Sequence, residues 1–152
     1  MDVHAQNKVH GQLTSHNIMI GFNRQPCIAD LGFYKVKKYA AILFSYTTKS
    51  SWSSPEILKD KRLIPTKTYE ENDIYSLGMI FWEILTQSEP FHGYSLKQLE
   101  EKVVTEGLRP MIPEGVSPDI SSLILSCWNT DPSTRPSIQL ICSTLDEVIN
   151  KY

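Results

Sequence analysis

Short groups of polar side chains recur along the chain, and their residue types could do chemistry. In chain order these motifs occupy residues 10–17, 30–32, 54–56, 73–78 and 131–137. They supply imidazole, amide, carboxylate, hydroxyl and guanidinium groups, which bind ligands through hydrogen bonds, hold metal ions or move protons. Each motif alone is a weak signal, so their order and spacing must indicate the chemistry.

The bulk composition indicates one ordinary domain with a hydrophobic core. The chain has 152 residues, of which 41% are apolar and 21% charged. A net charge of −2 gives no electrostatic case for binding nucleic acid or an acidic membrane surface. The longest apolar stretch, residues 77–85, is too short to span a bilayer, and the first residues lack the pattern of a secretory signal. We therefore expect no membrane insertion and a cytoplasmic location.

The three cysteines, Cys27, Cys127 and Cys142, are widely spaced and stand in apolar surroundings. An odd number with this spacing favours buried core thiols in a reducing compartment over a disulfide or a metal site.

The elements that must position the motifs begin with two short strands. Apolar runs at residues 17–20 and 27–29, separated by a turn at residues 23–26, predict a hairpin. Residues 32–54 are rich in Ser, Thr, Tyr and Lys without a sustained period, which indicates a long functional loop.

The rest of the chain is predicted to be helical. Asn72 is the expected N-cap of a helix that ends near Thr86 and is apolar on nearly every side, as is typical of a helix inside a core. Further helix starts are predicted at Ser95, Ser117 and Ser137, the first of these helices ending near Gly107. The predicted fold is mainly α, a helical bundle around one buried central helix with short β-strands near its N-terminal end.

The ordered motifs resemble the C-terminal lobe of protein kinases, from the catalytic loop to the last helix. Residues 106–113 and the Cys127-Trp128 pair are similar to the tyrosine-kinase-like group. Residues 106–113 and 131–136 are also similar to pseudokinase domains of the integrin-linked-kinase type. The resemblance implies one kinase domain over residues 1–152, with the C-lobe only and the N-lobe absent, and an activation segment at residues 30–56.

The resemblance places Asn17 and Asp30 at the two metal-ligand positions of the kinase site, where both residue types are chemically intact. The alternative for Asp30 is a carboxylate that only caps the loop beginning at Gly32. The implied cofactors are ATP and Mg²⁺, and neither is expected to bind tightly.

Other positions depart from the family pattern. Gln12 stands where the catalytic aspartate belongs, and an amide cannot take a proton near neutral pH. Gly11 replaces the arginine that reads a phosphate on the activation segment, and Thr14 replaces the catalytic-loop lysine. Lys49 stands where a threonine would pack against the loop. Because these departures fall in one cooperating cluster, we expect a pseudokinase.

The resemblance also implies structural roles for residues elsewhere in the chain. Asp73 is expected to accept hydrogen bonds from catalytic-loop amides. Glu56 and Arg135 are expected to form a buried, bidentate pair, with a weak exposed pair as the alternative. His10 is expected to be a packed structural histidine rather than a base or a metal ligand.

The loop hydroxyls and lysines leave two interpretations open. Phosphorylation of the loop and simple solvation fit the sequence equally well. Lys35, Lys37 and Lys38 favour a solvated basic stretch over a docking site for an acidic partner. The hydroxyl-bearing residues are Tyr34, Tyr39, Ser45, Tyr46, Thr47, Thr48, Ser50, Ser51 and Ser53.

Three functions are compatible with the sequence. The first is a catalytically impaired scaffold that binds a protein partner, such as another kinase or an adaptor, near the helix that starts at Ser95. The second is residual serine/threonine or tyrosine kinase activity, or the C-terminal part of a longer active kinase. The third is a degenerate fragment with no stable role.

Overall fold

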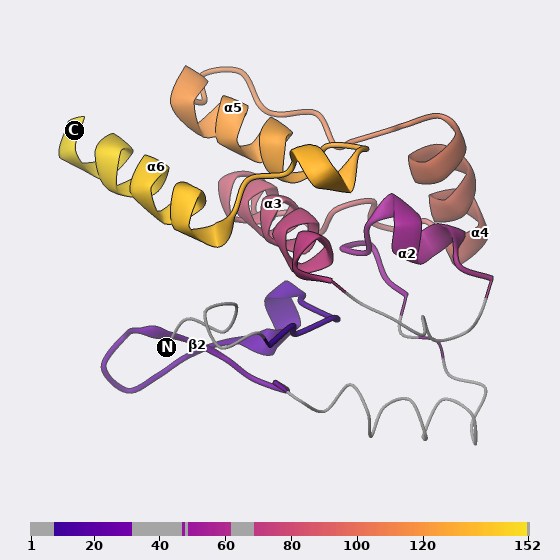
Figure 1. Ribbon diagram of the computed structural model, residues 1–152, viewed down its shortest axis with the longest axis horizontal. Helices are drawn as coiled ribbons and strands as arrows, with labels where there is room; N and C mark the ends of the chain where they lie inside the picture. The colour runs from indigo at the N-terminus through magenta and orange to yellow at the C-terminus, as the bar shows by residue number, and fades with distance from the viewer. Residues whose placement is uncertain (1–7, 32–46, 48, 62–68, 152) are drawn as a thin grey trace.

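The computed structural model describes residues 8–31, 47, 49–61 and 69–151, and helices dominate this part of the chain (Figure 1). The central helix, α3, has α5 and α6 on one side, α2 and α4 at one end, and the β1–β2 hairpin on the opposite side. In chain order the elements are η2 (Ser15–Asn17), β1 (Ile18–Ile20), β2 (Pro26–Ile28), α2 (Pro55–Lys59), α3 (Glu70–Thr86), α4 (Leu96–Leu99), η3 (Glu100–Thr105), α5 (Pro118–Cys127), η4 (Pro132–Thr134) and α6 (Ile138–Lys151).

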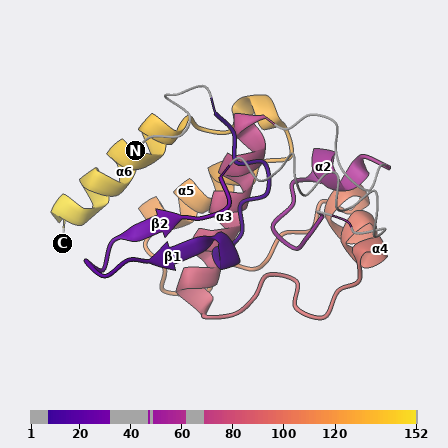
Figure 2. The ribbon, with the colours of Figure 1, turned by 90° about the horizontal axis from the view of Figure 1, so that it is seen from below.

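The predicted hairpin is present, with both strands within one residue of their expected positions. The strands are antiparallel, and Ile18 pairs with Ile28. Figure 2, seen from below, shows the hairpin in front of α3. Ile18 packs against the core, whereas Met19 and Ile20 are exposed. The hairpin therefore contributes little to the core and mainly carries the residues at its two ends.

The start of α3 differs from the prediction. The helix begins at Glu70 with Tyr69 as N-cap, so the prediction of Asn72 as the cap was wrong. Asn72 lies in the first turn, where its Oδ1 accepts a hydrogen bond from the Tyr69 backbone N–H at 2.8 Å. An asparagine can satisfy a helix start from inside the first turn as well as from the cap, and residue type alone does not distinguish these positions.

The first eleven residues of α3 supply four of the buried apolar side chains of the core. Tyr75 and Met79 have no exposed surface, and Ile74 and Ile80 are 3% exposed. At its C-terminal end the prediction of all-round burial was wrong, because Ile84 and Leu85 are 60% and 41% exposed. No described element covers the last turn on that side, so the apolar pattern continues beyond the packed part of the helix.

Gly78 permits the close approach of α3 to α5. A Cβ atom at this position would lie 2.8 Å from the Cβ of Cys127, closer than real Cβ atoms approach. The two helices therefore pack almost backbone to backbone at this point, which explains why a glycine interrupts an otherwise apolar helix.

The remaining helix starts were predicted correctly. Ser95, Ser117 and Ser137 each accept a backbone hydrogen bond from the first turn that follows. The helix from Ser95 ends close to Gly107 as expected, but its second part, η3, is a π-helix. The wider π turn was not predicted, because side-chain periodicity over six residues does not separate it from an α-helix.

The expectation of three core thiols was wrong for two of them. Only Cys127 is buried; Cys27 and Cys142 are exposed, and all three are free. Cys27 lies on the exposed hairpin, and Cys142 follows the buried Ile141 on the outer side of α6. Burial raises the pKa of the Cys127 thiol to about 12, so this side chain behaves as a small apolar group.

Among the described residues, no helix has the length and apolar character needed to cross a membrane. Most of the predicted activation segment, including Lys35, Lys37, Lys38 and the hydroxyls between residues 34 and 46, lies outside the described residues.

Candidate functional site

Asp73, in the first turn of α3, holds the loop that carries the first polar motif. Its Oδ2 accepts the backbone N–H of His10 at 2.7 Å, and its Oδ1 accepts that of Gly11 at 2.8 Å. His10 is buried, and its ring Nε2 lies 2.9 Å from the carbonyl oxygen of Ala29. The loop is thus fixed to α3 on one side and to the end of the hairpin on the other.

Gln12 follows His10 and Gly11 in this loop. Its Nε2 is buried and has no hydrogen-bond partner among the described residues. Its backbone is well held, because the Gln12 carbonyl oxygen accepts from Asn17 Nδ2 at 2.9 Å. The position is therefore ordered, but the group that it presents is a neutral amide, which can donate or accept hydrogen bonds but cannot act as a base.

Asn17 and Asp30 are brought together by the hairpin. Asn17 precedes β1, and its carbonyl oxygen accepts the N–H of Ala29, the residue before Asp30, at 2.7 Å. Asp30 is exposed and has a φ of 62°, a left-handed conformation that Asp tolerates better than most residues. Such a backbone is held only where surrounding structure demands it, as is typical of functional sites.

The residue types of Asn17 and Asp30 suit a magnesium ion that arrives with its own phosphate ligands. Asn17 donates through Nδ2 to the Gln12 carbonyl oxygen, and its Oδ1 accepts no hydrogen bond from the described residues. Mg²⁺ typically takes one or two protein oxygens and completes its shell with waters and phosphate oxygens. In the described part of the chain no group of three or more His, Cys, Asp or Glu side chains could hold a metal without such help.

Glu83 is a site residue that the sequence did not reveal. Its Oε1 accepts from Ser15 Oγ at 3.0 Å and its Oε2 from Trp52 Nε1 at 2.9 Å. Trp52 also meets the ring of His16 edge-on, with centroids 5.3 Å apart. The Glu83 carboxylate thus links three parts of the chain: the loop at residues 10–17, the segment before α2, and α3 itself. The only signal in the sequence is a glutamate interrupting an apolar helix.

The expected pair of Glu56 and Arg135 is present and bidentate. Arg135 Nη1 and Nη2 donate to Glu56 Oε1 and Oε2 at 2.7 and 3.0 Å. The Arg135 side chain is fully buried, and that of Glu56 is 33% exposed. Burial alone would raise the pKa of Glu56, but the hydrogen bond and positive charge of Arg135 outweigh burial and lower it.

Arg135 is further held by carbonyl groups and by an aromatic ring. It donates to the carbonyl oxygens of Glu71 and Asn129 at 2.8 and 3.0 Å. The guanidinium groups of Arg135 and Arg109 both lie over the Tyr75 ring, with their central carbons 5.1 and 5.2 Å from its centroid. Burial raises the pKa of the Tyr75 hydroxyl far above its usual range. The sequence did not predict these contacts, because no motif gave Arg109 a partner.

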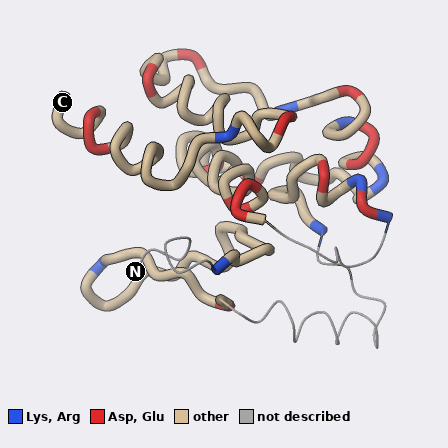
Figure 3. Tube along the Cα trace, viewed as in Figure 1, with Lys and Arg blue, Asp and Glu red and all other residues tan. Residues whose placement is uncertain are grey.

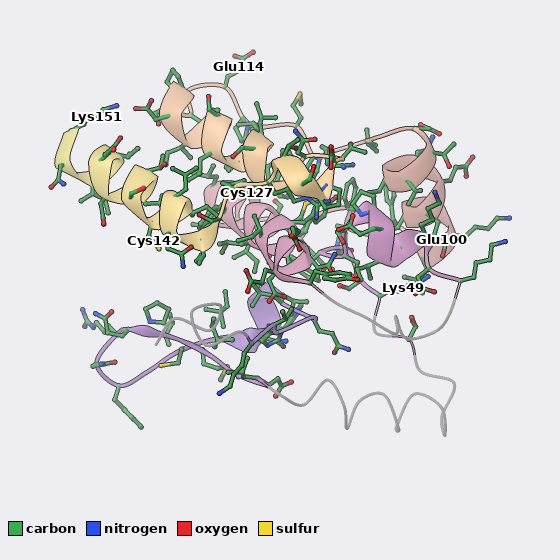
Figure 4. The ribbon with its side chains drawn as sticks, viewed as in Figure 1. Lys49, Glu100, Glu114, Cys127, Cys142 and Lys151 are labelled. Atoms are coloured by element: carbon green, nitrogen blue, oxygen red, sulfur yellow. The ribbon has the colours of Figure 1, made fainter. Side chains whose placement is uncertain are left out.

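Lys49 turns towards α2 and η3, as Figure 4 shows for Lys49 and Glu100. Its Nζ donates to the carbonyl oxygens of Leu58 and Asp60 and to the Glu100 carboxylate. The position expected to pack on the catalytic loop therefore serves a different contact.

Comparison with known proteins agrees with this geometry. The sequence profile of the family described as “Protein tyrosine and serine/threonine kinase” matches residues 3–145. The chain belongs to this kinase family. It is 33% identical over 153 residues to the dual specificity protein kinase shkC of Dictyostelium discoideum, covering 97% of this chain and 29% of the relative.

Further relatives in the kinase family are described as serine/threonine kinases. “Probable serine/threonine-protein kinase drkA” of Dictyostelium discoideum is 31% identical over 140 residues, covering 92% of this chain and 21% of that protein. Serine/threonine-protein kinase STY17 of Arabidopsis thaliana is 28% identical over 150 residues, covering 98% of this chain and 25% of that protein. The chain thus spans less than a third of the length of these curated relatives.

The predicted site residues of this kinase-family chain form two groups that meet at the first turn of α3. One group surrounds Asp73 and the other surrounds the Glu56–Arg135 pair, and Asn72 lies between them. Asn72 Nδ2 donates to Ser54 Oγ and Glu56 Oε1 at 3.0 and 2.6 Å. The first group consists of His10, Gln12, Asn17, Asp30 and Asp73.

Proposed function

We propose that this kinase-family chain acts mainly by binding a protein partner and that it is impaired in phosphate transfer. The observation that carries the proposal is Gln12, an amide at the position where the family resemblance places the catalytic aspartate. The Asn17 side chain donates to the Gln12 carbonyl oxygen, and this hydrogen bond supports the backbone conformation at position 12.

The chemical argument concerns the acceptor hydroxyl. In phosphate transfer by kinases, a carboxylate orients this hydroxyl and accepts its proton. The Gln12 amide has no negative charge and no usable basicity, so the hydroxyl would be neither attracted nor deprotonated. The amide at position 12 should therefore lower the rate of phosphate transfer and leave the stability of the fold unchanged.

The contacts that hold this region together do not need catalysis. Asp73 fixes the loop, and the Glu56–Arg135 pair fixes α2 to α3 and to the segment before α6. A rigid lobe of this kind can present a binding surface. The likeness of residues 106–113 and 131–136 to integrin-linked-kinase-type pseudokinase domains supports a protein partner, another kinase or an adaptor. Tyr94 and Leu96, exposed before and at the start of α4, are the proposed contact region.

A second candidate is residual kinase activity, or the C-terminal part of a longer active kinase. The specific observation in its favour is the backbone hydrogen bond from Ala29 to Asn17, which brings Asn17 and Asp30, two residues with oxygen atoms of the kind that Mg²⁺ binds, to the same end of the hairpin. The relatives described as serine/threonine or dual specificity kinases support the same candidate. When bound, Mg-ATP would supply the phosphoryl group and offset its charge, with Asn17 and Asp30 as the residues that hold the ion.

A nucleotide titration combined with a transfer assay distinguishes the two candidates. Mg-ATP at 100 times its dissociation constant would stabilise a binding-competent chain by about 2.7 kcal/mol, measured as a shift in the thermal midpoint. We expect no transfer of labelled phosphate to a generic substrate by the unmodified chain. Gln12→Asp is the restoring variant, and Gln25→Asp, which adds a carboxylate in the hairpin turn, is its control. Transfer by the unmodified chain above the level of a heat-denatured sample would overturn the proposal.

A further inference from the structure

Lys49 is a nearly buried lysine that precedes α2, and its side chain is only 6% exposed. Its Nζ donates to Leu58 O at 2.8 Å and to Asp60 O, and lies 3.4 Å from Glu100 Oε1 (Figure 4). An ammonium group has three donors, and each of the three is directed to an acceptor. A solvated surface lysine would not lose its water for contacts of this kind.

The acceptors belong to two different elements. Leu58 and Asp60 lie at the C-terminal end of α2, where carbonyl oxygens have no partner within the helix and carry partial negative charge. Glu100 opens η3 and adds a full negative charge. Lys59 stands at the same helix end but is exposed, and it has no described contact with these acceptors. Lys49 alone therefore supplies the cation that this junction needs among the described residues.

Beneath the ammonium group, α2 and η3 share a small apolar cluster. Leu58, Leu99 and Val103 are 1%, 2% and 1% exposed and pack together. In the described part of the chain, this cluster has only three buried members and meets the main core around α3 through Phe91. A charge-assisted contact across its edge therefore adds to the apolar packing that holds α2 against η3.

The chain between Lys49 and α2 is pinned on its other side by α3. The Trp52 carbonyl oxygen accepts from Ser76 Oγ at 2.9 Å, and Ser54 Oγ accepts from Asn72 Nδ2 at 3.0 Å. Residues 50–60 are thus held by α3, by the Glu56–Arg135 pair, by the apolar cluster and by Lys49. Among these contacts, the one made by Lys49 comes from the residue that immediately precedes the segment.

In kinases, segments at this place are ordered by a phosphate that pairs with arginine side chains. The family resemblance puts Gly11 at the position of such an arginine, and Gly11 has no side chain to offer. We propose that Lys49 is a built-in strap, a positioning residue that keeps α2 and the chain just before it, residues 50–60, docked on η3 without phosphorylation. The proposal is independent of the proposed function, because it holds whether or not the chain transfers phosphate.

Hydrogen–deuterium exchange of the full chain, produced in bacteria and treated with phosphatase, tests the strap. The unmodified chain is expected to protect residues 50–60 in this unphosphorylated state. Lys49→Met keeps the length of the stem but removes the charge, and it should speed exchange of this segment by about tenfold. Exchange within α3 should stay slow, because its contacts do not involve Lys49. A general loss of stability would raise exchange in both regions.

Three further variants make the result specific. Lys49→Arg should restore most of the protection, and Glu100→Gln should give a smaller increase in exchange than Lys49→Met. Lys59→Met, at the same helix end, is the matched control and should exchange like the unmodified chain. Equal exchange in the Lys49→Met and Lys59→Met proteins would overturn the proposal. Fast exchange of residues 50–60 in the unmodified chain would overturn it as well. If Lys49→Met does not fold, the comparison of Glu100→Gln with Lys49→Arg decides.

Discussion

Asp73 and Gln12 are close in the same site, yet they differ in what their side chains are tied to. Both oxygens of Asp73 accept backbone N–H groups, so its charge is used to hold the loop. The Gln12 Nε2 is buried without a partner among the described residues. At the scale of single residues, the carboxylate that stabilises the loop is present, and the side chain at the position expected for the catalytic aspartate is an amide.

Asp73→Asn tests the first of these contacts. The substitution removes the charge and one acceptor, so either the His10 or the Gly11 N–H is left without its partner. We expect a loss of about 1–3 kcal/mol in the free energy of unfolding, the usual cost of an unpaired buried group. Urea denaturation measures it. Asp146→Asn on the exposed side of α6 is the control, and an equal effect of both variants would contradict the role of Asp73.

Residue types predicted some of these contacts and not others. The partners of Asp73, and those of Glu56, followed from motifs whose members have fixed roles in the fold. The hydrogen-bond acceptors of Lys49 did not follow from the sequence, because a long side chain reaches whichever acceptors the tertiary structure brings near. The exposure of Cys27 and Cys142 was missed for a similar reason, since an apolar sequence neighbourhood does not say which side faces the core.

At the scale of elements, α2 is a helix of five residues and depends on its neighbours. A helix this short is not stable in isolation, because too few hydrogen bonds offset the cost of starting it. Glu56 ties it to Arg135, Asn72 ties it to α3, and Leu58 packs on η3. Weakening one of these ties should therefore loosen α2 before it affects α3.

The Glu56–Arg135 pair predicts a dependence of stability on pH. The folded-state pKa of Glu56 lies below its ordinary value of 4.5, so the pair stabilises the fold above pH 4.5 and is lost as pH falls through the folded pKa. Glu56→Gln should cost about 3 kcal/mol near pH 7, because Arg135 stays buried without its counter-charge.

Urea midpoints measured from pH 7 down to pH 3 check this prediction. The difference between the unmodified chain and the Glu56→Gln variant should shrink as pH falls below 4.5, because Glu56 of the unfolded chain is protonated there while folded Glu56 keeps its charge to lower pH. Glu147→Gln, on the exposed side of α6, should show no such trend. A difference that stays constant down to pH 3 would mean that the Glu56 charge does not carry the interaction.

The contact between α3 and α5 predicts the effect of Gly78→Ala. Alanine favours a helix over glycine by up to about 1 kcal/mol, which on its own would stabilise α3. The added methyl group would lie 2.8 Å from the Cβ of Cys127, so the helices must separate. We expect net destabilisation of about 1–3 kcal/mol, typical of an overpacked core, measured by thermal or urea unfolding.

The exposed position Ser122 in α5 supplies the control for Gly78→Ala. Ser122→Ala improves helix propensity without a steric conflict and should leave stability unchanged or slightly higher. If Gly78→Ala stabilises the chain as well, α3 and α5 can move apart at little cost and the close approach is not required.

Element types were easier to predict from the sequence than their boundaries and burial. Serines at helix starts and the turn of the hairpin act locally, so they were located correctly. The start of α3 and the exposure of Ile84 depend on what packs nearby, which periodicity does not contain. The π turn of η3 was missed for the same reason.

At the scale of the whole molecule, the two larger core clusters are joined. One contains Tyr75 and Met79, the other contains Ile74 and Cys127, and both have Leu77 and Phe81 at their edges. Figure 3 shows Lys and Arg interspersed with Asp and Glu over the helical part, in line with the net charge of −2. The lack of nucleic-acid binding expected from this charge stays a prediction.

Because the two clusters share residues, the helical part should unfold as one unit. Trp52, Trp82 and Trp128 all lie in or against the first cluster, so tryptophan fluorescence reports its packing, whereas far-UV circular dichroism reports the helices. The two probes should give the same urea midpoint. Met79→Ala should lower both midpoints together, with a loss of about 2–5 kcal/mol for a large buried side chain. Met111→Ala, at a position that is 86% exposed, should change neither. Separate midpoints would show that part of the helical structure unfolds independently of the first cluster, and a partner bound to one part would then not stabilise the other.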